Sequence, residues 1–349
     1  MTTSPSNPIL TDRTSEETDE LCGMKYWWYK LEGGKGIVPI EESVYLTDGK
    51  DIHNDLALFG EGASIEEVVS SIPLLPSSEL GQCALERYTR RIAWAVSFGL
   101  YIEPTLREFG EEVACEDEII LDRDPLWFGV IPDRVQRRKG GGLVYREWKS
   151  AKYLKKEWQD HWLYAIQLHL GIKALEEELG EPVEYGQVLG LNKGFDRDGR
   201  LIHPYVWAYR KGEEWSHEYK YGWDHAPVWE YPGGVVEWVK RCGPEVGLKQ
   251  FAWSAPVYLD QRLLDRWIEQ RLRRHAQIQP LKFIAQTDKA VRDSLFDQRL
   301  IHCRPSFGPE CPYLAACHNA SVNQSPLGSG LYVPRTPHHD LELIGIDEP

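Results

Sequence analysis

Three consecutive glycines, at positions 140–142, separate two strand-like runs near the middle of this 349-residue chain. The runs cover residues 127–135 and 143–149, and both are rich in the β-branched and aromatic residues that favour strands. Glycine adopts the backbone angles that tight turns need, so the cluster predicts a turn. The pattern therefore predicts two strands that pair with each other across residues 140–142.

The neighbouring segments extend this pair into an α/β pattern. Residues 155–179 have helical periodicity and Gly180 is placed to end that helix, while residues 185–191 predict another strand. Further predicted elements are a helix at 53–58, a helix that Ser78 caps and that runs to Phe98, a hairpin of 205–211 and 216–223, and helices at 259–275 and 281–296. The order helix, strand, strand, helix, strand predicts a mixed central sheet flanked by helices.

Composition sets the expected domain organisation. A chain that is 42% hydrophobic over 349 residues can bury a large core, as one enlarged domain or a core with an insertion. We expect residues 1–20 to be disordered and residues 21–317 to form one domain, with the aromatic stretch 22–31 docked on its core. Residues 195–255 would be an inserted or accessory β-rich segment, and residues 318–349 a C-terminal tail.

The expected compartment follows from what the sequence lacks. No run of about 18 apolar residues is present, so no membrane-spanning helix and no membrane partner is expected. The N-terminus is polar and acidic, unlike a signal peptide. Seven cysteines, an odd number in a long chain, favour metal ligands or free thiols over a disulfide framework. These features predict a cytoplasmic protein.

Charge is unevenly distributed along the chain. The net charge of -14 argues mildly against nonspecific binding to nucleic acid, whose phosphates are contacted by lysine and arginine. Residues 110–124 are acidic, whereas residues 134–156 contain one acid, Glu147, among nine basic residues. The basic residues are Arg134, Arg137, Arg138, Lys139, Arg146, Lys149, Lys152, Lys155 and Lys156. This segment is either a phosphate-contacting surface or a solvated basic face.

The strand at 143–149 carries an acid and a lysine in a chemically informative pattern. Side chains two residues apart on a strand project to the same face, so Glu147 and Lys149 would lie together and Trp148 would point into the opposite layer. Asp133, at the end of the preceding strand, would lie beside Glu147. Two carboxylates supply oxygen ligands for Mg²⁺ or Mn²⁺, and a lysine can stabilise charge that develops on a phosphate.

An acid and a lysine spaced in this way are common on strand surfaces, so the neighbouring residues decide the interpretation. His53 follows Gly49 at the start of a predicted helix, and Gln167 lies on the helix directly after the strand. Alone, His53 would more often be a histidine satisfied by local hydrogen bonds. Other acids near the predicted site are Asp122 and Asp124, assigned to a loop, and Glu86 on the preceding helix.

Together these motifs resemble the RecB-like branch of the PD-(D/E)XK nuclease superfamily, which includes CRISPR-adaptation exonucleases, the AddB nuclease domain and phage recombination exonucleases. The family pattern is a histidine after a glycine, an aspartate ending a strand, a (D/E)-x-K strand and a Gln-x-x-x-Tyr helix. Here the pattern falls on Gly49 and His53, Pro132-Asp133, Glu147-Trp148-Lys149 and Gln167. The chain departs from it at Gly171, where the tyrosine would stand.

The resemblance implies a restriction-endonuclease-like core and a metal-dependent DNA exonuclease. It implies His53, Asp133 and Glu147 as ligands of Mg²⁺ or Mn²⁺, with Lys149 near the attacking water and Gln167 orienting the lysine or contacting DNA. The substrate would be single-stranded DNA or resected ends, in recombination, repair or phage replication, with a recombination or replication protein as a partner. The alternative is a nucleic-acid-binding scaffold that keeps the fold without turnover.

The cysteines form a second pattern. Cys303, Cys311 and Cys317 are crowded into HCRPSFGPECPYLAACH, and Cys22 begins an aromatic stretch near the other end of the chain. This arrangement resembles the iron–sulfur subset of RecB-like nucleases, which implies that the four thiolates hold a [4Fe–4S] cluster and join the two chain ends. Zinc is the alternative, held by the three C-terminal cysteines and either His302 or His318. Cys83, Cys115 and Cys242 show no partner pattern.

Tryptophan is unusually frequent, with fourteen in the chain. Seven of them lie in two regions: Trp27, Trp28, Trp207, Trp215, Trp223, Trp229 and Trp238. Aromatic residues beside basic ones can stack on unpaired bases, which would make the 195–255 segment a grip for single-stranded DNA. Core packing is the alternative role and the more common one.

Overall fold

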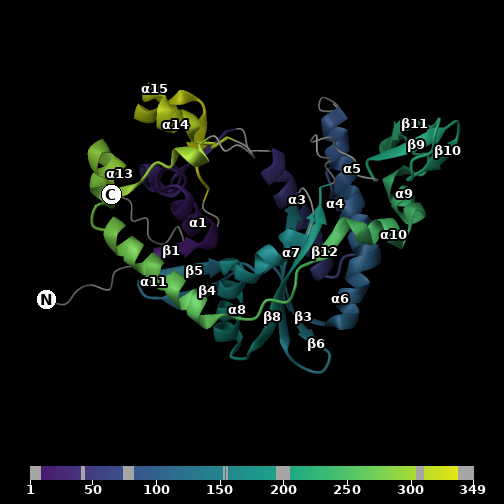
Figure 1. Cartoon of the computed structure of the whole chain (residues 1–349), viewed down its shortest axis with the longest axis horizontal. Coiled ribbons are helices and arrows are strands. Elements are labelled where there is room, and N and C mark those ends of the chain that lie inside the picture. Colours follow the sequence, from purple (N-terminus) through teal and green to yellow (C-terminus); the bar gives the residue numbers. More distant parts are fainter. Residues whose placement is uncertain are drawn as a thin grey trace. The chain divides into compact units, whose positions relative to one another are not determined.

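The computed structural model describes residues 9–40, 44–73, 82–151, 154, 156–193, 205–303 and 310–336 (Figure 1). The chain divides into two compact units. The first unit comprises Met1–Ser43, Glu118–Val130 and Asp260–Pro349, and the second comprises Val44–Asp117 and Ile131–Leu259. The segment 21–317, which we expected to form one domain, is thus shared between both units. The predicted acid and lysine residues belong to the second unit, and Cys22, Cys303, Cys311 and Cys317 belong to the first.

The second unit has a mixed α/β fold around a five-stranded sheet in the order β12-β8-β7-β6-β3. The strands are β3 (Gly110–Ala114), β6 (Arg134–Arg138), β7 (Leu143–Ala151), β8 (Val183–Asn192) and β12 (Phe251–Trp253). β7 is antiparallel to β6 and parallel to β8, so the sheet is mixed, as the sequence predicts. The predicted strands at 143–149 and 185–191 are confirmed as β7 and β8.

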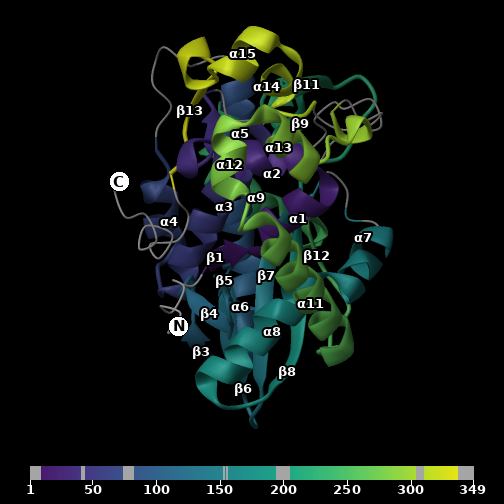
Figure 2. The same ribbon diagram turned by 90° about the vertical axis from the view of Figure 1, so that its left-hand side faces the viewer.

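Helix α8 (Ile166–Leu179) connects the parallel strands β7 and β8 and lies against both (Figure 2). Gly180 ends it in the left-handed conformation, with φ 68°, which confirms the predicted stop. The helix expected from residue 155 is interrupted, however. Its first part is the short helix α7 (Lys156–His161), followed by the 3-10 turn η5 (Trp162–Tyr164) before α8 begins.

The single strand predicted at 127–135 is wrong. The segment contains two strands, β5 (Leu126–Val130) and β6, which pair in different sheets and belong to different units. Pro132 lies in the break, where the lack of a backbone N–H prevents a continuous ladder. Asp133 therefore precedes β6 instead of ending the earlier strand. The glycine turn is confirmed between β6 and β7, and Gly140, Gly141 and Gly142 all have positive φ.

Two long helices pack on the Trp148 face of the sheet. They are α3 (Val44–Gly60) and α5 (Gln82–Ser97). Trp148 is 1% exposed and meets the ring of Phe98 edge-on at 5.7 Å. The sequence predicted that α3 starts at His53, but Gly49 is accommodated inside the helix, so His53 lies beyond its middle. The predicted cap Ser78 lies outside the described residues.

The accessory segment forms a small sheet of its own, in the order β10-β9-β11. Its strands are β9 (Trp207–Lys211), β10 (Glu214–Ser216) and β11 (Asp224–Pro227). A hairpin is present, but the strand predicted at 216–223 is wrong: β10 pairs with β9 across a turn at 212–213 and overlaps the predicted strand only at Ser216, and β11 adds a third strand. Ala208, Trp215 and Ala226 are buried in the main core of the second unit, together with Trp238 of helix α9 (Gly234–Cys242).

In the first unit residues 9–21 form a strand and a helix, which differs from the disorder expected for residues 1–20. Strand β1 (Ile9–Asp12) pairs with β5 in parallel, β4 (Ile119–Arg123) pairs with β5 on the other side, and helix α1 (Arg13–Leu21) follows. The acids of α1 are held by helix α11 (Gln261–Ile278). Glu16 Oε1 lies 2.8 Å from His275 Nε2, and Arg274 donates two hydrogen bonds to Asp19.

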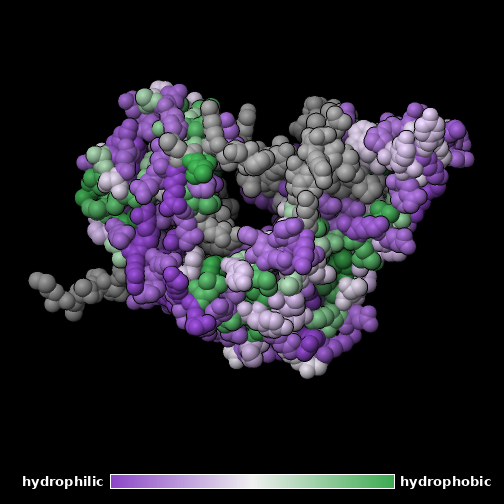
Figure 3. Space-filling model, in the orientation of Figure 1, coloured by the Kyte–Doolittle hydropathy of each residue, from purple (hydrophilic) through white to green (hydrophobic). Residues whose placement is uncertain are grey.

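Helix α11 confirms the prediction at 259–275, and its exposed face is hydrophilic (Figure 3). The helix expected at 281–296 is broken into α12 (Lys282–Thr287) and α13 (Lys289–Leu295). The break falls at Asp288, whose carboxylate accepts hydrogen bonds from the backbone N–H groups of Ala290 and Val291. An aspartate that caps a new helix in this way interrupts the preceding one.

The expected docking of residues 22–31 is confirmed, because Trp27, Trp28 and Phe296 share one buried cluster. The tail expected from residue 318 begins later. Helix α15 (Ala320–Gln324) is followed by strand β13 (Tyr332–Pro334), which pairs with β2 (Ile37–Pro39). Tyr332 is 3% exposed and stacks on Tyr313, which explains the order of this segment. Residues 337–349 lie outside the described part.

Among the helices that the structure describes, none combines the length and the apolar character needed to cross a bilayer.

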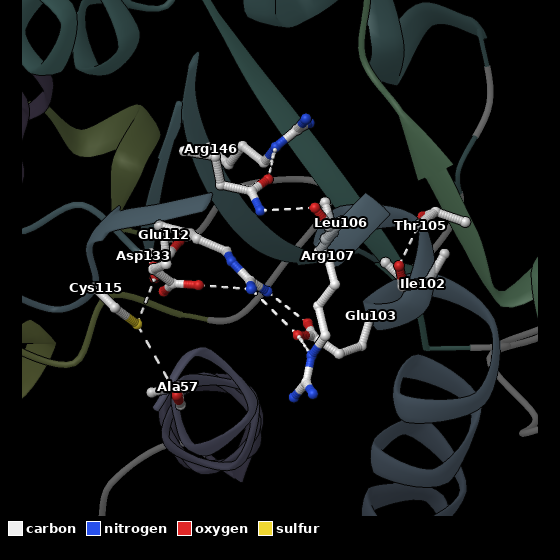
Figure 4. Close-up of polar contacts among 12 residues, drawn as sticks. Ala57, Ile102, Glu103, Thr105, Leu106, Arg107, Glu112, Cys115, Asp133 and Arg146 are labelled. Carbon is white, nitrogen blue, oxygen red and sulfur yellow. Dashed lines mark hydrogen bonds and ion pairs between the residues drawn. The ribbon is translucent and has the colours of Figure 1, made fainter. Parts of the chain in front are cut away.

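A buried ion-pair network fixes the start of β6, next to Asp133 (Figure 4). Arg134 is 3% exposed, and its guanidinium lies 2.5 Å from Glu103 Oε2 and 2.6 Å from Glu112 Oε2. Glu103, on helix α6 (Glu103–Phe109), also pairs with Arg107, whose side chain is 55% exposed. Because the charges of Arg134 are compensated inside the protein, the backbone on either side of it has one strongly preferred position.

These two arginines give a prediction about stability. Arg134→Met leaves the buried Glu103 carboxylate without its buried partner, and we expect a loss of about 3 kcal/mol in the free energy of unfolding. Arg107→Met removes an exposed partner of the same carboxylate and should cost at most about 1 kcal/mol. Urea denaturation measures both variants. Equal losses would contradict the anchoring role of Arg134.

Candidate functional site

Asp133 is the centre of the candidate site in the second unit. Arg134 and Arg146 are register partners on β6 and β7, which places Asp133 opposite Glu147. The Asp133 side chain is buried, and its Oδ2 accepts a 2.5 Å hydrogen bond from the backbone N–H of Trp148. Its Oδ1 lies 2.7 Å from Nδ1 of His53, which α3 supplies. The structure thus brings together two predicted residues that are far apart in the sequence.

Glu147 and Lys149 project from β7 to the same face, as their spacing predicts. Lys149 Nζ donates to Glu147 Oε2 at 2.7 Å, and Gln167 Nε2 of α8 donates to the same oxygen at 2.5 Å. The other carboxylate oxygen, Oε1, accepts a hydrogen bond from the hydroxyl of Tyr145. Glu147 is 2% exposed, so these donors replace the water that a surface carboxylate would have.

A third acid, Glu116, joins His53 and Asp133. One potential ligand atom from each of these three residues lies within 4.8 Å of the other two. Glu116 follows β3 in a turn with φ 54°, and its backbone N–H donates to the carbonyl of Pro132 at 2.9 Å. A non-glycine residue in the left-handed region is uncommon and often marks a functional position. Glu147 is not a member of this close group, so its role as a ligand stays a prediction.

Sequence reasoning missed Glu116 because it is one of several acids in the stretch 110–124. The acids considered instead are placed elsewhere. Glu86 accepts a hydrogen bond from Gln82 on its own helix. Asp124 follows β4, and Asp122, which we assigned to a loop, lies within β4 itself; both belong to the first unit. The left-handed turn and the bond to Pro132 that single out Glu116 are not visible in the sequence.

The electrostatics of the site show how closely its charged groups interact. Burial opposes the charged form of His53, but the neighbouring Asp133 carboxylate outweighs it and raises the histidine pKa. For Asp133, burial raises the pKa, but His53, Lys149 and the Trp148 N–H together lower it below its ordinary value. Burial and the nearby Asp133 raise the pKa of Glu147, although Lys149 and Tyr145 act in the opposite direction.

The carboxyl group of Glu116 resists ionisation near neutral pH. Its residue surface is exposed, yet partial desolvation of the carboxyl group, followed by repulsion from Asp133, raises its pKa to about 7. The Glu147 carboxylate adds to that repulsion, and His53 opposes it. These three carboxyl groups repel one another when they are ionised, and a divalent cation would relieve that repulsion.

The arginines of the basic segment 134–156 have partners within the protein, so for them neither a free phosphate-contacting surface nor a simply solvated face describes their surroundings. Arg137 pairs with Glu181 and Arg138 with Glu184. Arg146 is 4% exposed, and its guanidinium lies 4.5 Å from the ring centre of Phe109 and 4.9 Å from that of Trp253. Burial lowers the pKa of Arg146 to about 10. Lys152 and Lys155 lie outside the described residues, so Lys149 is the basic residue of this segment that the structure places in the site.

Aromatic residues of the accessory sheet divide between its two faces. Trp215 and Trp238 are core residues. On the other face Trp207 stacks on His225 at 5.8 Å, and His225 lies 4.9 Å from the ring of Tyr209. Core packing is thus confirmed for the first pair. The predicted grip on single-stranded DNA stays a prediction for the second group.

The four cysteines of the second pattern lie in the first unit. Cys22 and Cys303 are buried, and Cys311 and Cys317 are half-buried. Burial raises the pKa of Cys317 to about 11. The hydrogen bond from Trp28 opposes this rise, and the other three cysteines add to it. Trp28 Nε1 donates to Cys317 Sγ at 3.2 Å, and the Cys311 N–H donates to the Cys303 carbonyl at 2.9 Å. Cys22, Cys311 and Cys317 thus belong to one cluster of buried and partly buried side chains, and Cys303 is joined to Cys311 through the backbone, although these residues come from both ends of the chain.

Among the described residues, the group with all its ligand atoms within 4.8 Å of one another is the His53 group, and no set of cysteines meets that limit. His318, a candidate zinc ligand, has its Nε2 2.8 Å from the amide of Gln298. His302 is exposed. No disulfide joins the cysteines of the described residues.

The remaining cysteines have other surroundings. Cys115 donates to the carbonyl of Asp133 at 3.2 Å and supports the backbone of the candidate site (Figure 4). Burial raises the pKa of Cys115 to about 12 and that of Cys242 to about 12, so both thiols stay protonated near neutral pH. The side chain of Cys83 lies outside the described part.

The sequence matches no protein-family model and none of the curated proteins.

The close group of His53, Glu116 and Asp133 gives a prediction about metal binding. Glu116→Gln keeps the side-chain length but removes the charged donor, and we expect the affinity for Mn²⁺ to fall by roughly tenfold or more, equivalent to about 1.4 kcal/mol. Asp133→Asn should have a similar effect. The signal of free Mn²⁺ in electron paramagnetic resonance measures the affinity of each variant.

The matched control is Asp117→Asn, which neutralises the exposed acid next to Glu116 in the same turn. It should leave the Mn²⁺ affinity unchanged. An affinity as high in Glu116→Gln as in the wild type would exclude Glu116 as a ligand.

Proposed function

We propose that the second unit is a restriction-endonuclease-like nuclease domain that hydrolyses phosphodiester bonds of DNA with a divalent cation. The observation that carries the proposal is the group of His53, Glu116 and Asp133 beside the hydrogen-bonded pair of Glu147 and Lys149. The mixed sheet, in which α8 connects the parallel strands β7 and β8, supports the same assignment. Single-stranded DNA or DNA ends are the proposed substrate.

The donor atoms of the group fit this kind of cation. Two carboxylates supply the hard oxygen ligands that Mg²⁺ and Mn²⁺ prefer. The imidazole of His53 is a softer donor, and this favours Mn²⁺ over Mg²⁺. The raised pKa of Glu116 has its origin in partial burial and repulsion between carboxylates, which an added positive charge would offset.

Each residue would contribute in a definite way. A cation bound there would polarise a phosphate oxygen and lower the pKa of a water molecule. Asp133 is held in one orientation by His53 and by the Trp148 N–H, so it needs little rearrangement to bind. Lys149 is fixed by Glu147 and places a positive charge where the phosphate becomes more negative during cleavage.

Gln167 and Glu147 together hold the amine of Lys149 in position. Both Gln167 Nε2 and Lys149 Nζ donate to Oε2 of Glu147, so this oxygen connects α8 to the lysine of β7. Gln167 thereby restricts the Glu147 carboxylate and, through it, the amine. This agrees with the expected orienting role of Gln167 and does not require that it contacts DNA.

Cleavage of 5′-labelled single-stranded DNA in the presence of Mn²⁺ tests the proposal. Lys149→Met keeps the aliphatic length and removes the charge, and we expect kcat to fall by about 10²-fold or more, as for other preorganised transition-state donors. Asp133→Ala should show no cleavage above background. Lys149→Met leaves Asp133 and the Arg134 anchor in place and should fold, and the circular dichroism spectrum of Asp133→Ala shows whether its loss of activity occurs in a folded protein.

The control is Lys173→Met, which removes a lysine that pairs with Glu177 on the outer part of α8. It should cleave like the wild type. Equal degradation by all four proteins would remove the active-site assignment. Binding of DNA by a wild type that never cleaves it would instead support the scaffold alternative.

We also propose that Cys22, Cys303, Cys311 and Cys317 hold a [4Fe–4S] cluster in the first unit. Cys22, Cys311 and Cys317 belong to one cluster of buried and partly buried side chains, and the backbone N–H of Cys311 donates to the carbonyl of Cys303. Four thiolates can each bind one iron of a [4Fe–4S] cluster, which supports the proposal. Zinc, held by the three C-terminal cysteines and a histidine, is the alternative.

Absorption spectra of protein purified without oxygen test this second proposal. We expect a broad visible band in the wild type and its loss in Cys311→Ser, because one of the four thiolates is then missing. Cys242→Ser changes a buried cysteine of the second unit and should keep the band. A colourless wild type that contains one equivalent of zinc would contradict the cluster.

A further inference from the structure

Tyr145 is a fully buried tyrosine on β7, two residues before Glu147 and on the same face of the strand. Its hydroxyl group donates a hydrogen bond to Oε1 of Glu147. Burying a hydroxyl group and a carboxylate costs free energy unless they are hydrogen-bonded. The position of the hydroxyl relative to the carboxylate oxygen is therefore restricted. Neither the spacing of the acids nor the family resemblance pointed to this residue.

Two glycines define the space for the Tyr145 ring. Gly171 lies on α8, one turn after Gln167, and a methyl group there would lie 2.5 Å from Cε1 and 2.7 Å from the hydroxyl oxygen of Tyr145. Gly186 is the register partner of Tyr145 on β8, and a methyl group there would lie 3.3 Å from Cδ1 of the same ring. Contacts at 2.5 Å do not occur between non-bonded carbons, so a side chain at 171 would displace the ring.

Glycine in a helix interior is less favourable than alanine, so Gly171 needs a reason. Its conformation is helical and does not require glycine. The close approach of the Tyr145 ring is the physical reason that the structure offers. It also accounts for the departure from the Gln-x-x-x-Tyr pattern, because a second aromatic ring at position 171 would not fit.

The geometry points to Tyr145 as a positioning residue that orients the carboxylate of Glu147. The hydroxyl group donates to Oε1 of Glu147, so Oε2 is the oxygen that accepts hydrogen bonds from Lys149 and Gln167. Without the hydroxyl, the carboxylate can rotate about its last torsion, and the amine of Lys149 loses a fixed partner. Gly171 and Gly186 make this arrangement possible by admitting the ring. The catalytic consequence rests on the nuclease activity proposed above, whereas the orienting contact does not.

Tyr145→Phe tests the inference, because it keeps the ring between the two glycines and removes only the hydroxyl. In the Mn²⁺-dependent cleavage of single-stranded DNA, kcat should fall by roughly tenfold while KM stays within about twofold, since the hydroxyl acts on an oriented group and not on the substrate. Gly171→Ala should produce the same split by pushing the ring away. Full kcat in Tyr145→Phe would overturn the positioning role and leave the nuclease proposal intact.

The matched control is Tyr205→Phe. Tyr205 is another fully buried tyrosine of the second unit, whose hydroxyl lies near Ser97 and Gly247. Its loss should lower the denaturation midpoint without changing kcat. A fall in kcat equal to that of Tyr145→Phe would show that any lost buried hydroxyl has this effect, and would overturn the inference.

A double-mutant cycle tests the contact even if the wild type does not cleave DNA. Urea denaturation is measured for Tyr145→Phe, Glu147→Gln and the double variant. If the hydroxyl orients the carboxylate, the effects of the two substitutions on stability are not additive. Additive effects would overturn the inference whatever the outcome of the cleavage assay, and non-additive effects in an inactive wild type would support the contact while the nuclease proposal fails.

Discussion

The buried carboxylate of Asp133 is the constraint around which the second unit is arranged. One oxygen faces His53 of α3, and the other accepts the N–H of Trp148 in β7. The next residue, Arg134, is held by two buried or half-buried acids, and the carbonyl of Asp133 itself accepts from Cys115. A helix, a strand and a turn therefore meet at this one residue. An isolated charge is costly to bury, and His53 and the Trp148 N–H are the partners that compensate the Asp133 carboxylate.

Local sequence signals predicted the elements on which the site is built. The glycine turn, the strand β7, the helix stop at Gly180 and the strand β8 were all visible, because turns and helix ends depend on single residues. The common face of Glu147 and Lys149 followed from strand geometry alone. What failed depended on partners far away in the sequence. The segment 127–135 was predicted to be one strand, but it contains two strands, separated at Pro132, that belong to different sheets.

The same limit applies to charged residues. The acids of α1 resembled a disordered, solvated segment, but Arg271, Arg274 and His275 of α11 compensate them inside the first unit. The basic segment after Asp133 resembled an exposed surface, but its arginines are paired or lie between aromatic rings. Composition cannot distinguish a charge that faces water from one that faces a partner. Glu116 was missed for a related reason. Its left-handed backbone conformation distinguishes it from the neighbouring acids, but that conformation cannot be predicted from the sequence of an acidic stretch.

The hydrogen bond between the Glu116 N–H and the Pro132 carbonyl joins the two ends of an excursion, residues 118–130, that belongs to the first unit and forms β4 and β5 there. Glu116 and Asp133 are thus held together by a backbone bond at the base of the excursion, and their spacing does not depend on the number of residues in between. The excursion itself is not free to vary, because β5 pairs with both β1 and β4 and Phe128 is fully buried.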